Sequence, residues 1–587
     1  MNILLYDSRD LVLGALSRIS VLIALSTIIS LVIFHGYELT DAQNYIVGLI
    51  VRVSIGYYLM KFLIEVIYDF HPWAFVKSRK WEAILMGFLV LDILVINIRG
   101  IELLSFLGDA IGVGSFQSGF VLLLQFYVIV IVFLEFGKVG ERLPDFNLSP
   151  PALLLISFIL LIALGTGLLM LPEMMAGSGS LDFISALFTS ISASCVTGLS
   201  LIDISTVLSF KGQMIVMILM QLGGLNIISF AALFAILRGG FGMRQQNFMS
   251  ENLGESMLQS GRLVGSIFRL TFTIELIGAI LLGIIWFPEF DSLGNTLFYS
   301  VFHSISAFNN AGFSLFSNSL ATEGSAFLPA VHGVIALLII LGGIGFGTLS
   351  DILSQPWRNQ PLTRSWRGLR LGTKVGLTVA IILLISGGLV LSLTLGYNGD
   401  LGSHLFASLF QSITARTAGF NTIDFGTMAM PALLFMMFLM FVGGGSGSTA
   451  GGIKTSTFAL VFLSAYATIR GKKDINIYKN KIPWELINRA FAVFLFAIVF
   501  IFLGIFVLTI LEPDIALLDL AFEQVSAFCT VGLSTGITSE LSLGSQTVIM
   551  LSMLIGRVGT LTLAFALSGT RPESNSFSYP KGYLHVG

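Results

Sequence analysis

The chain has 587 residues, of which 55% are hydrophobic and only 11% are charged. Its mean hydropathy of +0.91 is too high for a string of soluble domains, because a water-facing surface typically requires about 25% charged residues. This composition excludes a cytosolic enzyme, a disordered regulator and a nucleic-acid binder, whereas the net charge of −2 says nothing about partners. The chain is therefore predicted to be an all-α protein that crosses a membrane several times.

Residues 1–149 predict four membrane helices. A crossing helix needs about 20 mostly apolar residues, because all of its backbone groups must be hydrogen-bonded within it. Segments of this kind lie at 11–35, 46–68, 82–98 and 117–137. None carries the regularly spaced arginines of a voltage sensor, so we interpret the four as an N-terminal extension with a structural or dimer-contact role.

After residue 150, long and short apolar segments alternate. The long ones lie near 152–172, 213–237, 264–287, 331–353, 374–396, 431–470, 487–511 and 545–568. Between the members of each pair lies a run of about 15 residues, at 181–195, 294–308, 400–415 and 515–529. These runs are too short to cross a bilayer and are predicted to be re-entrant half-helices.

Basic residues predict the orientation of these segments. The linkers 238–262, 355–374 and 470–489 are rich in Arg and Lys, whereas the connections after the short runs contain only Lys211. Cytoplasmic loops of membrane proteins carry an excess of Lys and Arg. The linkers and both termini are therefore expected to be cytoplasmic, and the half-helices are expected to enter from outside.

The four short runs are copies of one another. They read FTSISASCVTGL from 188, FHSISAFNNAGF from 302, FQSITARTAGF from 410 and FEQVSAFCTVGL from 522, and the third is one residue shorter. Recurrence at a period of about 110 residues predicts a repeated architecture. We expect helix–half-helix–helix repeats at 150–262, 263–372, 373–485 and 486–570, followed by a tail at 571–587.

The segment after each half-helix is predicted to line a pore. Non-helical backbone survives at membrane depth only inside protein or along a watery cavity, and its carbonyls can replace the hydration shell of a cation. Glycine adopts positive φ without a steric cost, which lets successive carbonyls align. Neutral oxygens suit a monovalent cation. The predicted selectivity filter is Val196, Thr197, Gly198, Asn310, Ala311, Gly312, Thr417, Ala418, Gly419, Thr530, Val531 and Gly532. The alternative is that these glycines only permit close helix packing.

A glycine-rich stretch interrupts the second long helix of the third repeat. Six of the ten residues from 443 to 452 are glycine, and each costs about 1 kcal/mol relative to Ala inside a helix. We therefore predict an intramembrane loop at 443–454. A phosphate-binding loop is the alternative, but Ile453 separates the last glycine from Lys454 and no strand precedes it.

These motifs resemble the Trk/Ktr/HKT superfamily of potassium transporters. The Ser/Thr-Ala half-helix copies and the stretch GGGSGSTAGGIKT at 443–455 carry the resemblance, which covers about 150–587 and is closest to the bacterial Trk/Ktr membrane (pore) subunit. It implies potassium uptake and no enzymatic activity, with K+ as the transported ion and no organic cofactor. It also implies a homodimer in the cell inner membrane, resting on a ring of nucleotide-binding (RCK-type) regulatory subunits. The glycine in each filter copy implies a preference for potassium, since serine in the first copy accompanies sodium preference.

The resemblance also assigns a gate. Arg557 lies in an apolar span, where a charge is costly and is a functional candidate. In the family, an arginine here faces the pore and contacts the intramembrane loop. The expected gate is Gly443, Gly444, Gly445, Ser446, Gly447, Ser448, Thr449, Gly451, Gly452, Lys454 and Arg557. The alternative for Arg557 is a structural ion pair, for example with Glu275.

Several other residues allow more than one interpretation. Arg416 is expected to brace the filter from behind, because a fixed positive charge facing the pore would repel a cation. Asn309 and Asn310 would either line the entrance or bond the filter backbone. Small buried packing groups are expected at Cys195 and Cys529, and satisfied half-helix residues at His303 and His404.

Two alternative functions stay open. The first is a sodium-permeable or weakly selective monovalent cation channel, because each repeat supplies a single filter glycine. The second is a membrane-bound nucleotide-hydrolysing enzyme that uses the glycine-rich loop.

Overall fold

The computed structural model describes residues 2–69, 71–78, 83, 87, 150–237, 262–290, 292–321, 328–354, 362–395, 401–472 and 474–559. Apart from Ala83 and Gly87, the predicted spans at 82–98 and 117–137 lie outside the described residues, as does the tail at 571–587. The chain divides into two compact units, each treated by itself. Unit 1 is Met1–Phe146 with Leu171–Ser180 and Leu233–Phe241, and unit 2 is the remainder.

In unit 1, small polar side chains join two long helices, α1 (Asn2–Gly36) and α2 (Asp41–Tyr68), which are followed by α3 (Pro72–Ser78). Thr27 and Ser54 share a hydrogen bond of 2.7 Å between their hydroxyls, and the Tyr57 hydroxyl donates to Leu16 O at 2.6 Å. Such contacts allow apolar helices to associate closely without leaving a polar group unpaired. The predicted helices at 11–35 and 46–68 are confirmed as helices.

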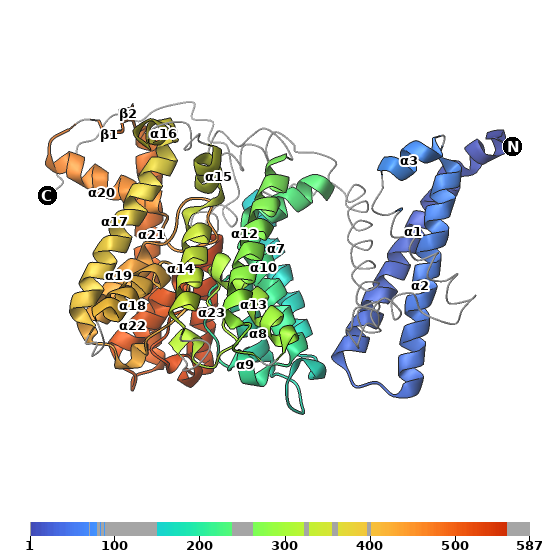
Figure 1. Ribbon diagram of the computed structural model, residues 1–587, viewed down its shortest axis with the longest axis horizontal. Coiled ribbons are helices and arrows are strands. Elements are labelled where there is room, and N and C mark those ends of the chain that lie inside the picture. The colour runs from blue at the N-terminus through green and yellow to red at the C-terminus, as the bar shows by residue number, and fades with distance from the viewer. Residues whose placement is uncertain are drawn as a thin grey trace. The chain divides into compact units, whose positions relative to one another are not determined.

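In unit 2, one order of elements recurs four times (Figure 1): a long helix, a short helix, a loop and a further helix. The first long helices are α7 (Pro150–Leu169), α12 (Arg262–Trp286), α17 (Leu371–Thr394) and α21 (Trp484–Leu511). The short helices are α8 (Phe183–Ser194), α13 (Leu293–Phe308), α18 (Leu401–Thr414) and α22 (Leu517–Phe528), at the positions predicted for half-helices. The helices that complete the order are α10 (Phe210–Leu237), α14 (Pro329–Ile344) with α15 (Phe346–Ser354), α19 (Met430–Phe441) with α20 (Thr455–Ile469), and α23 (Leu543–Val558).

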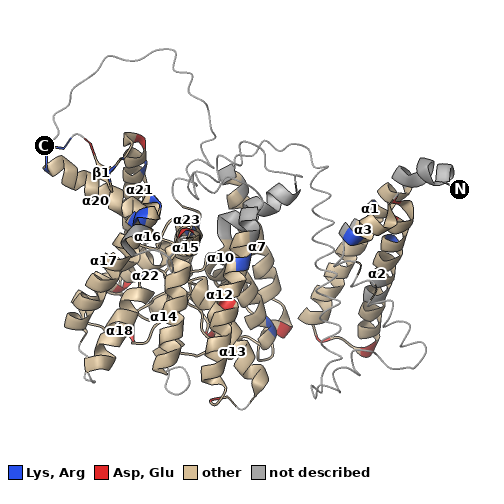
Figure 2. Cartoon of the chain, turned by 45° about the horizontal axis from the view of Figure 1, so that its top comes forward, with Lys and Arg blue, Asp and Glu red and all other residues tan. Residues whose placement is uncertain are grey.

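Short elements connect these helices. They are η1 (Pro172–Met174), α9 (Ile204–Val207), η3 (Ser319–Ala321), α16 (Leu362–Gly368), η5 (Phe425–Thr427) and η6 (Ile537–Glu540). A two-residue hairpin pairs β1 (Asn476–Ile477) with β2 (Asn480–Lys481) in antiparallel register. Figure 2 shows few charged residues along the middle of the unit 2 helices, whereas Lys and Arg occur near α16 and β1.

Two of the helices that complete the repeated order of elements are broken. The predicted interruption between α19 and α20 is present, because the helix ends at Phe441 and resumes at Thr455. The long apolar segment predicted at 331–353 contains a break that was not expected: the chain bends by 97° between α14 and α15. The bend lies at Gly345, whose φ of +97° is accessible to glycine but strained for other residues.

Four described helices are long and apolar enough to cross a membrane by length and composition. They are Val12–Gly36, Ser266–Trp286, Leu371–Thr394 and Trp484–Leu511, and the bent α14–α15 pair would make a fifth. Other predicted spans are represented in the described residues by shorter apolar helices, such as Leu154–Leu169 and Leu543–Val558. A mostly apolar set of helices of this kind is typical of a membrane protein.

Glycines let each short helix approach its long neighbour. Ser190, Ser304 and Ser412 occupy matching positions and donate to carbonyls of α7, α12 and α17, at 2.8, 2.7 and 3.0 Å respectively. Opposite these side chains, and opposite Gln524 of α22, the long helices have Gly165, Gly278, Gly387 and Gly504. A side chain at any of these glycines would overlap the polar group, so the glycines fix how deeply each half-helix is seated.

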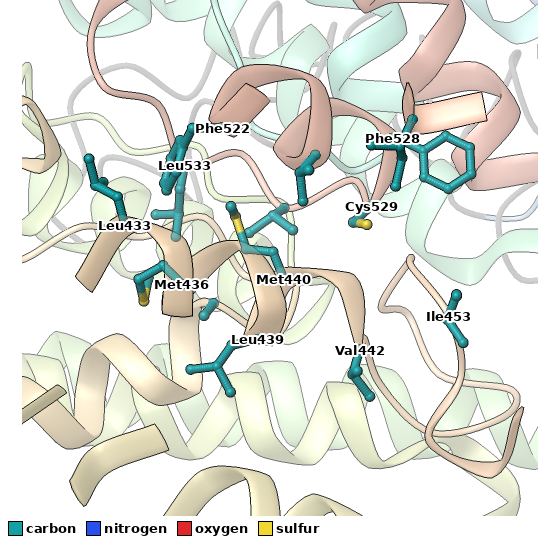
Figure 3. Close-up of a cluster of buried hydrophobic side chains, with 14 of the residues drawn as sticks. Leu433, Met436, Leu439, Met440, Val442, Ile453, Phe522, Phe528, Cys529 and Leu533 are labelled. Atoms are coloured by element: carbon teal, nitrogen blue, oxygen red, sulfur yellow. The ribbon is translucent and has the colours of Figure 1, made fainter. Parts of the chain in front are cut away.

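A hydrophobic core joins the third and fourth repeats (Figure 3). Met436, Leu439 and Met440 of α19 belong to one buried cluster with Phe522 of α22 and Leu533 of the loop that follows α22. Burial of large apolar side chains holds the two repeats together on this side. The cluster also includes Val442 and Ile453, so the glycine-rich loop is anchored to this core at both of its ends.

Replacing Gly387 by Ala is expected to lower the stability of the full chain by about 1–3 kcal/mol, the usual cost of overpacking. The added methyl group would overlap Ser412 Oγ and press on Leu439. Gly372→Ala is the control in the same helix, because a methyl group there meets nothing within 4 Å. The measurement is the melting temperature in detergent, and equal values for the two variants would contradict the packing role.

Candidate functional site

The four predicted filter glycines lie against one another in a closed ring. A methyl group added at Gly198 would lie 2.6 Å from Ala311 O, and one at Gly312 would lie 3.0 Å from Ala418 O. The added group at Gly419 would lie 2.5 Å from Val531 O, and at Gly532 it would overlap Thr197 O. Each repeat therefore contacts the next in sequence order, and the fourth contacts the first.

Each of these glycines has a left-handed backbone. The φ angles are +98°, +71°, +79° and +92° at Gly198, Gly312, Gly419 and Gly532. An L side chain in this conformation is strained, and in this ring it would also collide with the neighbouring carbonyl. Two independent constraints, φ and close approach, therefore require glycine at this position.

A second left-handed residue lies two positions earlier in each copy, which the sequence did not predict. The φ angles are +57° at Val196, +58° at Asn310, +70° at Thr417 and +50° at Thr530. Positive φ was expected only at the glycine, so each copy has one more left-handed residue than predicted. A left-handed conformation costs roughly 1–2 kcal/mol for a non-glycine residue, so the surrounding contacts must enforce it.

Hydrogen bonds to carbonyls of each half-helix enforce this turn. Thr197 N, Ala311 N and Val531 N each donate to a half-helix carbonyl five residues earlier, at 2.8 Å. In the shorter third copy, Ala418 N donates to Thr414 O, four residues earlier, at 2.9 Å. The turn in the third copy is therefore one residue tighter, and Gly419 still takes its place in the ring.

The recurring Ser/Thr of the half-helices bonds the backbone of the predicted filter glycine or of the residue that directly follows it. Ser192 Oγ and Ser526 Oγ accept from Gly198 N and Gly532 N, both at 3.1 Å. In the other two copies, Ser306 Oγ donates to Phe313 O at 2.7 Å and Thr414 Oγ1 donates to Phe420 O at 2.6 Å. This role explains why a hydroxyl recurs at that position in all four copies.

The predicted gate loop is closed on itself. Gly443 N donates to Ile453 O at 2.9 Å, and Ile453 N donates to Phe441 O at 3.2 Å. Lys454 Nζ donates to Ala450 O at 2.6 Å. The loop is therefore a compact structure with bonded ends, and its lysine is used within the loop.

The loop also contacts the second and fourth repeats. Thr449 Oγ1 donates to Phe308 O at the end of α13, at 3.1 Å, and Gly445 N donates to Gly343 O at 2.8 Å. A methyl group added at Gly451 would overlap Oγ1 of the filter residue Thr530. The loop therefore lies directly against Thr530 of the predicted filter.

Two arginines bind this loop. Arg557 is buried, and its Nη1 donates to Thr449 O while its Nη2 donates to Gly223 O at 2.7 Å. Arg416 Nη2 donates to Gly443 O at 3.1 Å, and its Nη1 donates to Ala380 O at 3.4 Å. Both side chains bond backbone carbonyls, which places Arg416 between a filter segment and the start of the loop.

The proposed pairing of Arg557 with Glu275 is not present in the described residues. Glu275 instead accepts from Gln221 at 3.0 Å and from Asn309 Nδ2 at 2.9 Å. Asn309 therefore bonds the side chains of Gln221 and Glu275, while the buried Asn310 amide has no partner within the described part of the chain.

The remaining candidates are buried or hydrogen-bonded within the protein. Cys195 and Cys529 are buried and free, as expected. His303 lies between Tyr299 O at 2.8 Å and Ser314 Oγ at 3.1 Å, and His404 contacts Ser392 O at 2.8 Å. Within the described ranges, no group of three His, Cys, Asp or Glu residues could hold a metal ion.

Comparison with known proteins identifies the family. The model of the family "TrkH: Cation transport protein" matches residues 152–579. The Ktr system potassium uptake protein B of Bacillus subtilis is 39% identical over 75% of this chain and 97% of its own length, and that of Vibrio alginolyticus is 37% identical over 74% and 95%. The potassium/sodium uptake protein NtpJ of Enterococcus hirae is 36% identical over 75% and 98%.

A solved structure shares the fold. The crystal structure of the potassium transporter TrkH from Vibrio parahaemolyticus matches 82% of this chain and 97% of that chain, with a TM-score of 0.57 and 18% identity. The family matched by sequence consists of transporters and not of enzymes. The extent of the family match and the identity to its curated relatives show that this chain belongs to the TrkH family of cation transport proteins.

Proposed function

We propose that this chain takes up potassium across the cell inner membrane, through a pore lined by the four filter segments. The observation that carries this proposal is the closed ring of Gly198, Gly312, Gly419 and Gly532. The curated relatives named above as potassium uptake proteins support the choice of ion.

The chemistry of the pore follows from the backbone. Carbonyls of the twelve filter residues would replace water around a K+ ion, and the C-terminal ends of the four half-helices would add favourable dipoles. Uncharged oxygens suit a monovalent ion. The membrane potential would drive inward movement with about 2.3 kcal/mol per charge per 100 mV.

Weak selectivity is the second candidate. The relative from Enterococcus hirae is named a potassium/sodium uptake protein, so sodium permeation by this chain is a specific alternative. A nucleotide-hydrolysing role has no comparable support, because Lys454 is bonded within its own loop and the family is a transporter family.

Gating would use the loop at 443–454, which contacts the predicted filter residue Thr530 and is bonded by Arg557. The positive charge of Arg557 would oppose a passing cation, and its bond to Thr449 O would keep the loop closed. We propose four pore repeats at 150–262, 263–372, 373–485 and 486–570, with both termini in the cytoplasm. The chain would form a homodimer on a ring of nucleotide-binding regulatory subunits, and this ring would move the loop.

Uptake by whole cells tests the proposed function. The full chain is expressed in cells that lack their own potassium transporters, alone and with a regulatory subunit of a Ktr system. We expect growth at low potassium and uptake of Rb+ in excess of Na+. Equal uptake of both ions would favour the weakly selective alternative, and no uptake in either arrangement would contradict the proposal.

Replacing Gly532 by Ala is expected to reduce Rb+ uptake at least tenfold. The methyl group would both strain a φ of +92° and overlap Thr197 O, so the ring could not close. Gly294→Ala is the control, because its nearest neighbour is Ser292 Oγ at 3.5 Å. Uptake is normalised to the protein in the membrane, and wild-type uptake by the Gly532 variant would contradict the filter assignment.

Replacing Arg557 by Ala is expected to raise Rb+ uptake several-fold in the absence of the regulatory subunit. The change removes the bonds to Thr449 O and Gly223 O and the electrostatic barrier. Arg470→Ala is the control, because Arg470 is an exposed cation at the end of α20. If uptake and its dependence on the regulatory subunit were unchanged, the gate role of Arg557 would be wrong.

A further inference from the structure

One position of the half-helices is occupied by a different residue in each repeat. It directly follows the recurring phenylalanine and holds Thr189, His303, Gln411 and Glu523. All four side chains are completely buried. Because the backbone of this position is helical in every copy, the differences between the repeats lie in what each side chain bonds.

Three of these side chains bond the chain as it leaves the filter. His303 Nε2 lies 3.1 Å from Ser314 Oγ, and Gln411 Nε2 donates to Thr422 Oγ1 at 2.9 Å. Glu523 Oε1 accepts from Ser534 Oγ, and also from Thr538 Oγ1 at 3.1 Å. Ser314 and Ser534 lie two residues beyond the filter glycine, and Thr422 lies three residues beyond it.

The bonded serines also hold the next turn of the chain. Ser314 Oγ accepts from Phe316 N at 3.0 Å, and Ser534 Oγ accepts from Gly536 N at 2.9 Å. Each of these hydroxyls therefore links a half-helix side chain to a backbone turn beyond the filter. Irregular backbone lacks the regular hydrogen bonds of a helix, so bonds of this kind fix its position.

Within the described residues, the first repeat lacks this link. Thr189 Oγ1 has no partner in the described part of the chain, because its side chain is short. Ser200, the counterpart of Ser314 and Ser534, donates instead to Ile202 O at 2.7 Å. Thr189 is therefore a natural comparison for the other three residues.

Glu523 is the one carboxylate among the four, and it receives two hydroxyl hydrogen bonds on Oε1. Both donors lie beyond Gly532 in the same loop. Ser534 Oγ and Thr538 Oγ1 also lie 2.9 Å apart, so without the acceptor the two hydroxyls would bond each other and lose their tie to the half-helix. The filter segment that ends at Gly532 would then lose its fixed outer end.

We propose that Glu523 is a positioning residue for ion selectivity, which fixes the outer end of the fourth filter segment through Ser534 and Thr538. His303 and Gln411 hold the second and third segments in the same way, and the first segment has no such support. This inference rests on the proposed function, because it assigns selectivity to a filter formed by these segments. A filter discriminates between ions of similar charge only if its oxygens are held at a set spacing.

The test measures Rb+ and Na+ uptake by the purified full chain with its regulatory subunit in proteoliposomes. Glu523→Ala is expected to lower the Rb+/Na+ uptake ratio at least threefold. Glu523→Gln keeps an acceptor oxygen at the same reach and is expected to retain the ratio within about twofold. Thr189→Ala, the matched control at the equivalent position, is expected to leave the ratio unchanged.

A second variant covers the case in which Glu523→Ala does not fold. Ser534→Ala removes one donor but leaves the half-helix intact, and it is expected to lower the ratio at least twofold. A wild-type ratio in folded Glu523→Ala, or in Ser534→Ala where the former does not fold, would overturn the inference. Equal losses in the Ala and Gln variants would also overturn it, because charge would then matter and not hydrogen-bond acceptance. If the wild-type chain took up neither ion, the proposed function itself would fail.

Discussion

The close approach of four backbone segments at their glycines is the constraint on which the rest of the molecule depends. Each glycine combines positive φ with contact against the carbonyl that precedes the next glycine in the ring. Backbone can pack this closely only if the half-helices are seated deeply, and Gly165, Gly278, Gly387 and Gly504 make that seating possible. The helices outside the ring can therefore be understood as a frame that holds four short segments of irregular backbone in place.

The glycine-rich loop at 443–454 is likewise irregular backbone that the surrounding protein must hold in place. Its backbone lies among apolar helices, so its polar groups must find partners within the protein. It meets this need through bonds between its own ends and through carbonyls that accept from Arg416 and Arg557. Within the described residues, both arginines are therefore held by backbone dipoles and not by an opposite charge.

Much of the fold could be predicted from the sequence because the signals are local. The short apolar runs predicted half-helices to within two residues of α8, α13, α18 and α22. The helix break near residue 443 was expected because six glycines within ten residues are incompatible with a stable helix. The bend at Gly345 was missed, since one glycine in an apolar run is common in membrane helices and gives no sign of a 97° turn.

The sequence by itself determined that four related segments exist, where each half-helix lies, and which glycine of each copy is special, because composition and recurrence are properties of the chain. Only the tertiary structure decided the contacts between the copies. The positive φ of Val196, Asn310, Thr417 and Thr530 opposes local preference and is enforced by hydrogen bonds to carbonyls of the half-helices. The partners of Arg557, Arg416 and Glu523 are likewise set by folding, because a buried polar group bonds the groups that the packed helices bring within reach.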